Sequence, residues 1–407
     1  MENKLNSKRK VCIKTFGCQM NVRDSEALLG LFLAKGYKSV DNPKDADAIL
    51  LNTCAVRAHA EHRVRSILGS YKKLSGVRRQ LSDGDKKRTE GRNLKPGNCK
   101  IIGLVGCMAA NSGKEIFERM PHVNLIVSPA KLHKIPAYIE KIKKENIRII
   151  DLEDKEREEI FYSASYRIKP GYAQVVISTG CSNYCSYCVV PNVRGGLRLR
   201  KPKDIISEVK RNVSLGIKKI TLLGQNVNDY RIESCGFASD SKSHRLKTVN
   251  FVDLLKMVEE LDGVEEIDFL TPHPKNTTKE LFKLMAESKK IKKYLHLPFQ
   301  AGSDRILRLM HRGYTKKEYL ALVDDYKTIV GGTIGTDIIV GFPTETEEDF
   351  LHTKDILEKL RFMGAYIFKY SPRPGTHAQK LKDDVPQRIK EKRHAVLLEL
   401  QKKISNA

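Results

Sequence analysis

The feature that most limits the fold of this 407-residue chain is a repeated alternation of short apolar stretches with helical stretches. Strands that alternate with helices pack as parallel sheets, because each helix returns the chain to the same edge of the sheet. Two segments carry this pattern, and a charged connector within residues 135–171 separates them. We therefore predict an α/β protein with one domain over residues 1–150, a second over 165–380 and a C-terminal helix over 381–407.

The first segment predicts an open parallel sheet. Its strands are expected at Lys10–Lys14, Ala48–Leu51 and Lys100–Val105. A helix over Asp24–Lys35, with Gly36 just after its end, follows the first strand, and a second helix runs to Leu68. The stretch over residues 72–100 is rich in lysine and arginine. A loop of this length is usually functional or disordered, so contact with RNA and a plain surface loop both stay open.

The second segment repeats the strand and crossover theme six times. Its strands are expected at Tyr172–Ser178, Lys219–Leu223, Glu266–Leu270, Tyr294–Leu297, Gly335–Val340 and Ala365–Lys369. Six parallel strands with helices between them fit an open, partial (β/α) barrel better than a doubly wound sheet. The last helix is expected to open at Pro386 and to run to about Ile404.

The charge balance of the chain concerns its partners more than its fold. Lysine and arginine number 74 against 49 aspartate and glutamate residues, a net charge of +25. This excess of positive charge favours a polyanion such as nucleic acid as the binding partner. The alternative is that the charge reflects a generally basic proteome or a charged soluble surface. No signal peptide or membrane span is visible, so we expect a cytoplasmic protein. In a reducing compartment its nine cysteines are better read as metal ligands or catalytic groups than as disulfides.

The most specific motif is the Cys-x3-Cys-x2-Cys set of Cys181, Cys185 and Cys188, just after a predicted strand. Three thiolates so close together can hold one face of a [4Fe-4S] cluster. Such clusters usually have four cysteine ligands, so three leave one iron open for chemistry. The alternatives are a zinc site lacking its fourth ligand and chance clustering, although zinc sites favour two separated cysteine pairs.

A second cysteine set is spread along the first segment. Cys18, Cys54 and Cys107 stand in the contexts TFGCQMN, LLNTCAVR and LVGCMAA. Each follows a predicted strand, and the carboxyl ends of parallel strands form the ligand-binding edge of a sheet. Gly17 and Gly106 would allow close approach of the backbone. The alternative, that free cysteines are small buried apolar residues, suits Cys12 and Cys235. Cys99 is ambiguous, because it precedes its strand.

Together these residues resemble the methylthiotransferase family of radical S-adenosylmethionine (SAM) enzymes over essentially the whole chain, and TFGCQMN is most similar to its MiaB branch. Further matching stretches are LLGQNVNDY (222–230), LHLPFQAGSDRILRLM (295–310), GTDIIVGFPTETEEDF (335–350) and YSPRPGTHA (370–378). The resemblance implies two [4Fe-4S] clusters. Cys18, Cys54 and Cys107 would bind an auxiliary cluster, while Cys181, Cys185 and Cys188 would bind the catalytic cluster of a radical SAM barrel.

The resemblance also implies the reaction. One SAM would donate a methyl group to sulfur at the auxiliary cluster, and a second would be cleaved at the catalytic cluster to a 5′-deoxyadenosyl radical. The radical would abstract hydrogen from C-2 of N6-dimethylallyladenosine next to the anticodon, where the methylthio group is inserted. The implied partners are the tRNA anticodon stem-loop and an electron donor such as flavodoxin or ferredoxin. The chain is expected to be a monomer and not to associate with a membrane.

Two kinds of alternative stay open. Within the enzymes, the substrate could be a ribosomal protein or threonylcarbamoyl-adenosine in tRNA. Outside them, the chain could be a non-catalytic Fe–S or zinc protein that binds RNA.

The residues that would contact SAM are expected at the carboxyl ends of the barrel strands, where such barrels carry their active sites. The candidates are Gly224, Gln225, Asn226, Gln300, Ser303, Asp337 and Gly341. The alternative for each is a role in a turn or a helix cap.

The sequence departs from the family pattern in two places. The stretch VVPNVRGGLRLRK (189–201) lacks the acidic residue that the family commonly has there. Its Arg194, Arg198 and Arg200 could still bind phosphate or substrate. The chain also stops at Ala407, where the family's TRAM domain would begin. We expect that this domain is absent, either naturally or by truncation.

Overall fold

The computed structural model of the chain describes residues 9–56, 58–75, 100–153, 166–167, 170–235 and 246–406. These residues form two compact units. The first comprises the chain to Ile168 together with Asn192–Arg194, and the second comprises Lys169–Pro191 and Gly195–Ala407.

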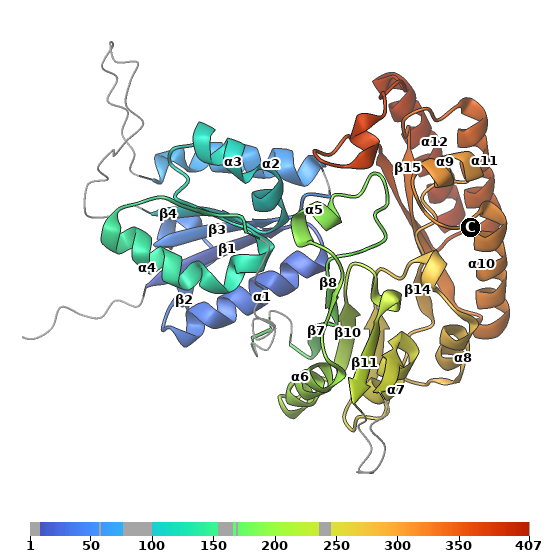
Figure 1. The fold of residues 1–407 in the computed structure, drawn as a ribbon, viewed down its shortest axis with the longest axis horizontal. Coiled ribbons are helices and arrows are strands. Elements are labelled where there is room, and N and C mark those ends of the chain that lie inside the picture. The colour runs from blue at the N-terminus through green and yellow to red at the C-terminus, as the bar shows by residue number, and fades with distance from the viewer. Residues whose placement is uncertain are drawn as a thin grey trace, which may run out of the picture. The chain divides into compact units, whose positions relative to one another are not determined.

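The first unit is a parallel sheet with the strand order β2-β1-β3-β4-β5-β6. Its strands are β1 (Lys10–Phe16), β2 (Lys38–Ser39), β3 (Ala48–Thr53), β4 (Ile101–Val105), β5 (Leu125–Val127) and β6 (Ile149–Asp151). Its helices are α1 (Gln19–Ala34), α2 (Ala58–Ser70), α3 (Cys107–Arg119) and α4 (Ile135–Glu145). Helices α1 and α4 cover one face of the sheet, and α2 and α3 cover the other (Figure 1). The central strands β3 and β4 are buried throughout, which explains the apolar runs AILL in β3 and IIGLV in β4.

The three strands predicted for this unit are confirmed, but the predicted start of the first helix is wrong. Helix α1 begins at Gln19 rather than at Asp24. Its first turns bury polar side chains, among them Asn21, Arg23 and Glu26. Buried polar residues remove the apolar period by which a helix is recognised in a sequence. Most of the basic stretch, residues 76–99, lies outside the described residues.

The second unit contains the six predicted parallel strands, divided between the sheets β13-β10-β7 and β14-β15-β16. The strands are β7 (Tyr172–Val176), β10 (Lys219–Leu223), β13 (Glu266–Phe269), β14 (Tyr294–His296), β15 (Thr333–Val340) and β16 (Gly364–Lys369). A single parallel bridge between Ile267 and Ile291 connects β13 to the segment before β14. Among the described residues, no strand pairs β7 with β16. The strands therefore form the open, partial barrel that the sequence predicts.

Helices connect the barrel strands and cover their outer side (Figure 1). They are α6 (Pro202–Ser214), α7 (Phe251–Glu259), α8 (Lys279–Glu287), α9 (Asp304–Leu309), α10 (Lys316–Val330), α11 (Glu347–Leu360) and α12 (Gln387–Ser405). The short helix α5 (Val190–Arg194) is not one of them, because Asn192–Arg194 belong to the first unit. Two antiparallel ribbons were not predicted. One pairs β8 (Ser178–Thr179) with β9 (Arg198–Leu199), and the other pairs β11 (Arg231–Cys235) with β12 (Leu246–Asn250). Pro386 is the N-cap of α12 rather than its first residue.

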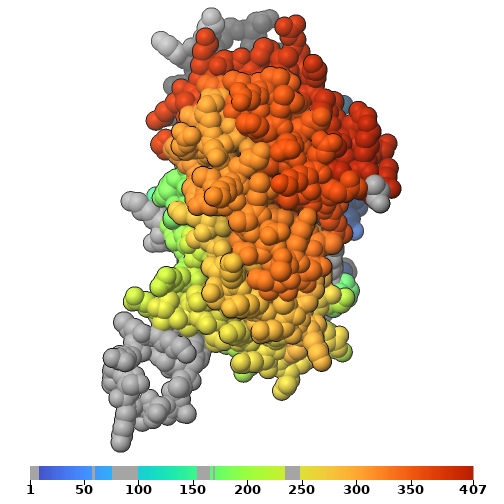
Figure 2. Space-filling model, turned by 90° about the vertical axis from the view of Figure 1, so that its right-hand side faces the viewer, coloured from blue at the N-terminus to red at the C-terminus, as the bar shows by residue number. Residues whose placement is uncertain are grey.

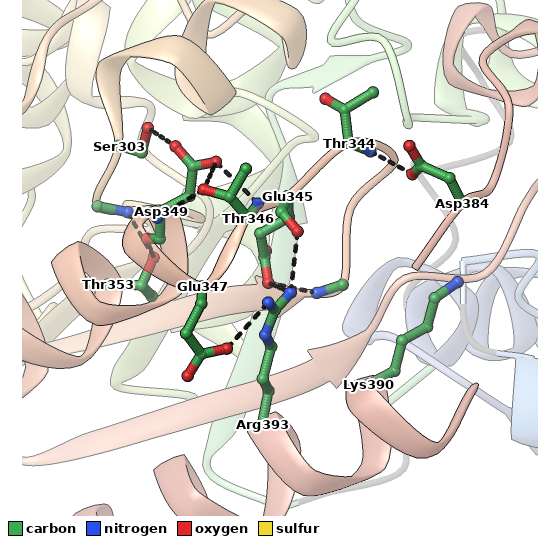
Figure 3. A network of polar contacts seen from close by, with 12 residues as sticks. Ser303, Thr344, Glu345, Thr346, Glu347, Asp349, Thr353, Asp384, Lys390 and Arg393 are labelled. Carbon is green, nitrogen blue, oxygen red and sulfur yellow. Dashed lines mark hydrogen bonds and ion pairs between the residues drawn. The ribbon is translucent and has the colours of Figure 1, made fainter. Parts of the chain in front are cut away.

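A buried polar network fixes α12 to the loop that follows β15. The Arg393 guanidinium, from α12, donates to Glu345 Oε1 at 2.8 Å, and the same oxygen accepts the Gly341 amide at 3.0 Å (Figure 3). Lys390, one turn earlier on α12, donates to both Asp383 oxygens, at 2.6 and 2.7 Å. Figure 2 shows an outer face of the unit, made by the part of the chain from α7 to α12, coloured yellow to red. The terminal helix is thus an integral part of the second unit.

We expect Glu345→Ala to destabilise the second unit by about 3 kcal/mol, because it leaves the buried Arg393 cation without its buried partner. The side chains of Glu345 and Arg393 are only 2% and 6% exposed. Urea unfolding followed by circular dichroism measures the effect. The matched control is Glu347→Ala, which removes the 66%-exposed second partner of Arg393 and should cost less than about 1 kcal/mol. Equal losses for the two variants would contradict the prediction.

Candidate metal centres

The first unit brings Cys18, Cys54 and Cys107 to one edge of its sheet. Cys18 is the N-cap of α1 after β1, Cys54 directly follows β3, and Cys107 opens α3 after β4. These three strands are neighbours, so the predicted convergence of the three cysteines is present. Gly17 makes the close approach possible, since a Cβ atom there would lie 2.2 Å from Cys54 Cβ.

Two buried asparagines hold the backbone of this edge in place. Asn21 Nδ2 donates to Asn52 Oδ1, and Asn52 Nδ2 donates in return to the Asn21 carbonyl, both at 2.9 Å. The Cys18 thiol donates to Asn21 Oδ1 at 3.1 Å, and a Cβ atom at Gly106 would lie 2.3 Å from Asn52 Oδ1. The sequence analysis missed both asparagines, although each lies within three positions of a cysteine in TFGCQMN or LLNTC.

The electrostatics of this edge favour one thiolate. A hydrogen bond from Cys54 and the nearby Arg194 lower the pKa of the Cys18 thiol to about 6. The same hydrogen bond and burial raise the pKa of Cys54, while burial raises the pKa of Cys107. Thiolate is the form in which cysteine binds metal, and of the three thiols only Cys18 has a lowered pKa.

Arg194 is the cation of this edge. It belongs to the first unit, and its Nε donates to Cys107 Sγ at 3.1 Å while Nη2 donates to Asp24 Oδ2 at 2.6 Å. Arg194 and Arg200, two of the three arginines considered for phosphate or substrate binding, thus have carboxylate partners within the protein. Both are buried against carboxylates, since Arg200 contacts Glu208 at 2.7 Å. Only Arg198 of the three is exposed.

In the second unit, Cys181, Cys185 and Cys188 lie on one short loop after β8. The loop closes on itself, because the Cys188 amide donates to the Cys185 carbonyl at 2.9 Å. It is also held from outside, since the Ser186 amide donates to the Met310 carbonyl at 3.0 Å. Antiparallel pairing of β8 with β9 closes the base of the loop.

In this second triad Cys185 is buried, while Cys181 and Cys188 are half-buried. Burial raises the pKa of the Cys181 thiol, and it raises the pKa of Cys188 to about 12. Such thiols ionise when a nearby positive charge compensates for the lost hydration, and a bound metal supplies that charge. The Arg312 guanidinium reaches the triad and donates to Cys185 Sγ at 3.4 Å. The sequence analysis missed Arg312.

Of the other cysteines, only Cys12 has a described side chain, and it belongs to neither triad. Cys12 is buried inside β1 and donates to the Asp41 carbonyl, which confirms its structural role. Cys99 and the side chain of Cys235 lie outside the described residues. Within the described part of the chain, no three Cys, His, Asp or Glu side chains are placed ready to hold a metal ion. Binding of a cluster by each triad therefore stays a prediction.

The best-supported SAM candidates follow β10. Gln225 Oε1 and Asn226 Oδ1 are buried without a hydrogen-bond partner, and so is Ser178 Oγ, which opens β8 just after the neighbouring β7. A Cβ atom at Gly224 would lie 2.4 Å from that serine oxygen. Buried polar atoms normally have partners, so unpartnered ones at the carboxyl ends of two adjacent strands indicate where a polar ligand binds. Ser178 was not among the predicted residues.

The remaining SAM candidates have different surroundings. Ser303 is the N-cap of α9 and donates to Asp349, and a Cβ atom at Gly341 would lie 2.3 Å from Lys390 Cγ, so both have structural roles. Gln300 bonds through its backbone to Asp337 and Ile339. Asp337, on β15, lies 3.3 Å from His296 Nε2. The geometry thus separates two structural residues from the five other candidates.

Comparison with known proteins agrees with this geometry. Residues 175–357 match the family model described as "Radical SAM superfamily", and residues 10–128 match "Uncharacterized protein family UPF0004". The radical S-adenosylmethionine methyltransferase TsrM from Kitasatospora setae has a similar fold, with a TM-score of 0.58 at 14% identity over 91% of this chain and 77% of its own. The fold and the site therefore define a protein of the radical SAM class.

Sequence relatives identify the family more closely. The tRNA-2-methylthio-N(6)-dimethylallyladenosine synthase of Aquifex aeolicus is 41% identical over 97% of this chain and 84% of its own length. The proteins of the same name from Carboxydothermus hydrogenoformans and Acetivibrio thermocellus are 39% and 41% identical, over 97% and 99% of this chain and 83% and 78% of their own lengths. The chain belongs to this synthase family. In the described residues, no helix is long and apolar enough to cross a membrane.

Proposed function

We propose that this chain methylthiolates C-2 of N6-dimethylallyladenosine next to the anticodon of tRNA, and that it uses one SAM as methyl donor and another as radical source. The observation that carries the proposal is the presence of two cysteine triads, one after the neighbouring parallel strands β1, β3 and β4 and the other on the loop after β8. The shared name of the relatives favours this substrate over a ribosomal protein or threonylcarbamoyl-adenosine.

The residues of each triad fit a [4Fe-4S] cluster with one open iron. Cys18, Cys54 and Cys107 supply three thiols at one edge of the sheet, in the first unit that we propose as the methylthiotransferase domain. Cys181, Cys185 and Cys188 supply three thiols on a pinned loop, in the unit that we propose as the radical SAM domain. When bound, the clusters supply the electron that cleaves SAM and the site that holds the sulfur.

The chain's own residues would then bind and orient SAM. Gln225, Asn226 and Ser178 offer buried polar atoms to the amino, carboxylate and ribose groups of SAM. The net charge of +25 supports binding to the phosphates of the anticodon stem-loop. Since the substrate is tRNA, we place the reaction in the cytoplasm, with a monomeric chain and a low-potential donor such as flavodoxin or ferredoxin.

Mass spectrometry of nucleosides from tRNA tests the proposal. A strain that lacks the gene should accumulate N6-dimethylallyladenosine and lose its 2-methylthio derivative. Reintroducing the gene for this chain should restore the 2-methylthio derivative. A deletion strain that keeps the 2-methylthio nucleoside would show that the chain has another substrate.

A further inference from the structure

Arg312 is a buried cation without a carboxylate partner among the described residues. It is only 4% exposed, and its nitrogens donate to the Tyr314 hydroxyl at 3.2 Å and to the Pro298 carbonyl at 3.0 Å. Its Nη1 donates to Cys185 Sγ at 3.4 Å and to the Tyr187 hydroxyl at 3.3 Å. Of these four partners, the Cys185 sulfur is the one that carries negative charge in a metal site.

The backbone conformation around Arg312 directs its side chain toward the cysteine loop. Helix α9 ends at Leu309, and the flanking residues His311 and Gly313 both have positive φ, 55° and 70°. The left-handed conformation is costly for a residue with a Cβ atom, and such strain gathers at functional sites. The same turn supplies the Met310 carbonyl that holds the cysteine loop through the Ser186 amide. One turn therefore both anchors the loop and points a guanidinium at its sulfur.

A buried guanidinium is strongly unfavourable unless an anion compensates for its lost hydration. A cluster held by three thiolates is such an anion, and it gains one further negative charge on accepting an electron. A cation at hydrogen-bond distance therefore stabilises the reduced form more than the oxidised form. Hydrogen bonds to cluster sulfurs are a recognised means by which a protein sets a cluster potential.

We propose that Arg312 is a positioning residue that raises the reduction potential of the cluster bound by Cys181, Cys185 and Cys188. It acts through its charge and its bond to Cys185, and it eases the one-electron transfer from an external low-potential donor to the cluster. The inference rests on the proposed function, because it takes from it the ligand set of the cluster.

The test uses the full chain with Cys18→Ala, Cys54→Ala and Cys107→Ala, which leaves one cluster to observe. Redox titration followed by electron paramagnetic resonance of the reduced cluster compares Arg312→Gln and Arg312→Lys with this parent. Arg312→Gln should lower the ratio of reduced to oxidised cluster about tenfold at a fixed ambient potential, a shift of about 59 mV for one electron. Arg312→Lys, which keeps the charge, should stay close to the parent. Arg308→Gln, which removes an exposed charge from the end of α9, should leave the potential unchanged.

Each outcome decides the matter. An Arg312→Gln chain with a full cluster and the parent potential would overturn the proposal, and so would equal shifts in the lysine and glutamine variants. If the glutamine variant lost its cluster, retention by the lysine variant at the parent potential would support the role of charge, whereas loss by both would assign Arg312 to folding alone. A parent without any cluster, judged by iron content and absorbance, would instead refute the ligand set on which the proposed function rests.

Discussion

Replacing Cys185 with alanine is expected to reduce the reductive cleavage of SAM by at least about 100-fold, since even a residue that only supports a metal ligand commonly contributes 10- to 100-fold. The buried Cys185 is the central member of its triad, and two remaining thiols cannot hold a cluster with one open iron. Release of 5′-deoxyadenosine under a strong reductant measures the effect. Bound iron should fall from about eight to about four atoms per chain.

Cys12→Ala is the control for this result. Cys12 is also a buried cysteine, but it lies inside β1 and belongs to neither triad. Its replacement should leave both the iron content and the release of 5′-deoxyadenosine close to those of the unaltered chain. Undiminished 5′-deoxyadenosine from the Cys185→Ala chain would remove Cys181, Cys185 and Cys188 from the role of radical cluster ligands.

Replacing Cys54 with alanine is expected to separate the two halves of the reaction. Cys54 is buried beside Cys18 and Gly17 in the first unit, where we place the cluster that holds the sulfur. The variant should still cleave SAM, because the second triad is intact, but methylthiolated nucleoside should fall at least about 100-fold. Bound iron should again fall to about four atoms per chain.

Both products must be measured in the same reaction with the prenylated anticodon stem-loop. A Cys54→Ala chain that makes methylthiolated nucleoside at the normal rate would exclude an auxiliary cluster at this edge. A chain that loses both products, while Cys12→Ala loses neither, would mean that the first triad is needed for radical formation as well.

Much of the fold and both cysteine triads could be predicted from the sequence. Parallel strands buried on both faces are short apolar runs, so β3, β4 and β10 stand out clearly from their polar surroundings. A cysteine directly after such a strand is placed by topology alone, because neighbouring parallel strands end at the same edge. The position of Cys54 beside Cys18 needed no knowledge of side-chain packing.

The residues that support the triads could not be predicted in this way. Asn21 and Asn52 come together only when two strands are paired, and nothing in the local sequence gives that pairing. Arg312 lies 127 positions from Cys185 and reaches it through an irregular turn. Ser303 takes the alternative role that the sequence left open for it, since it is the N-cap of α9. The periodicity of a sequence predicts where its helices and strands lie. The roles of these supporting residues depend instead on contacts between side chains that are distant in the sequence.

The attachment of α12 has a practical consequence for anyone dividing this chain into fragments. A fragment that ended at Lys380 would retain every barrel strand and all six triad cysteines. It would nevertheless deprive the Glu345 carboxylate of the Arg393 guanidinium and the Ile367 carbonyl of the His394 ring. A fragment for expression should therefore extend at least through Arg393, the counter-ion of the buried Glu345 carboxylate, although the last barrel strand ends at Lys369.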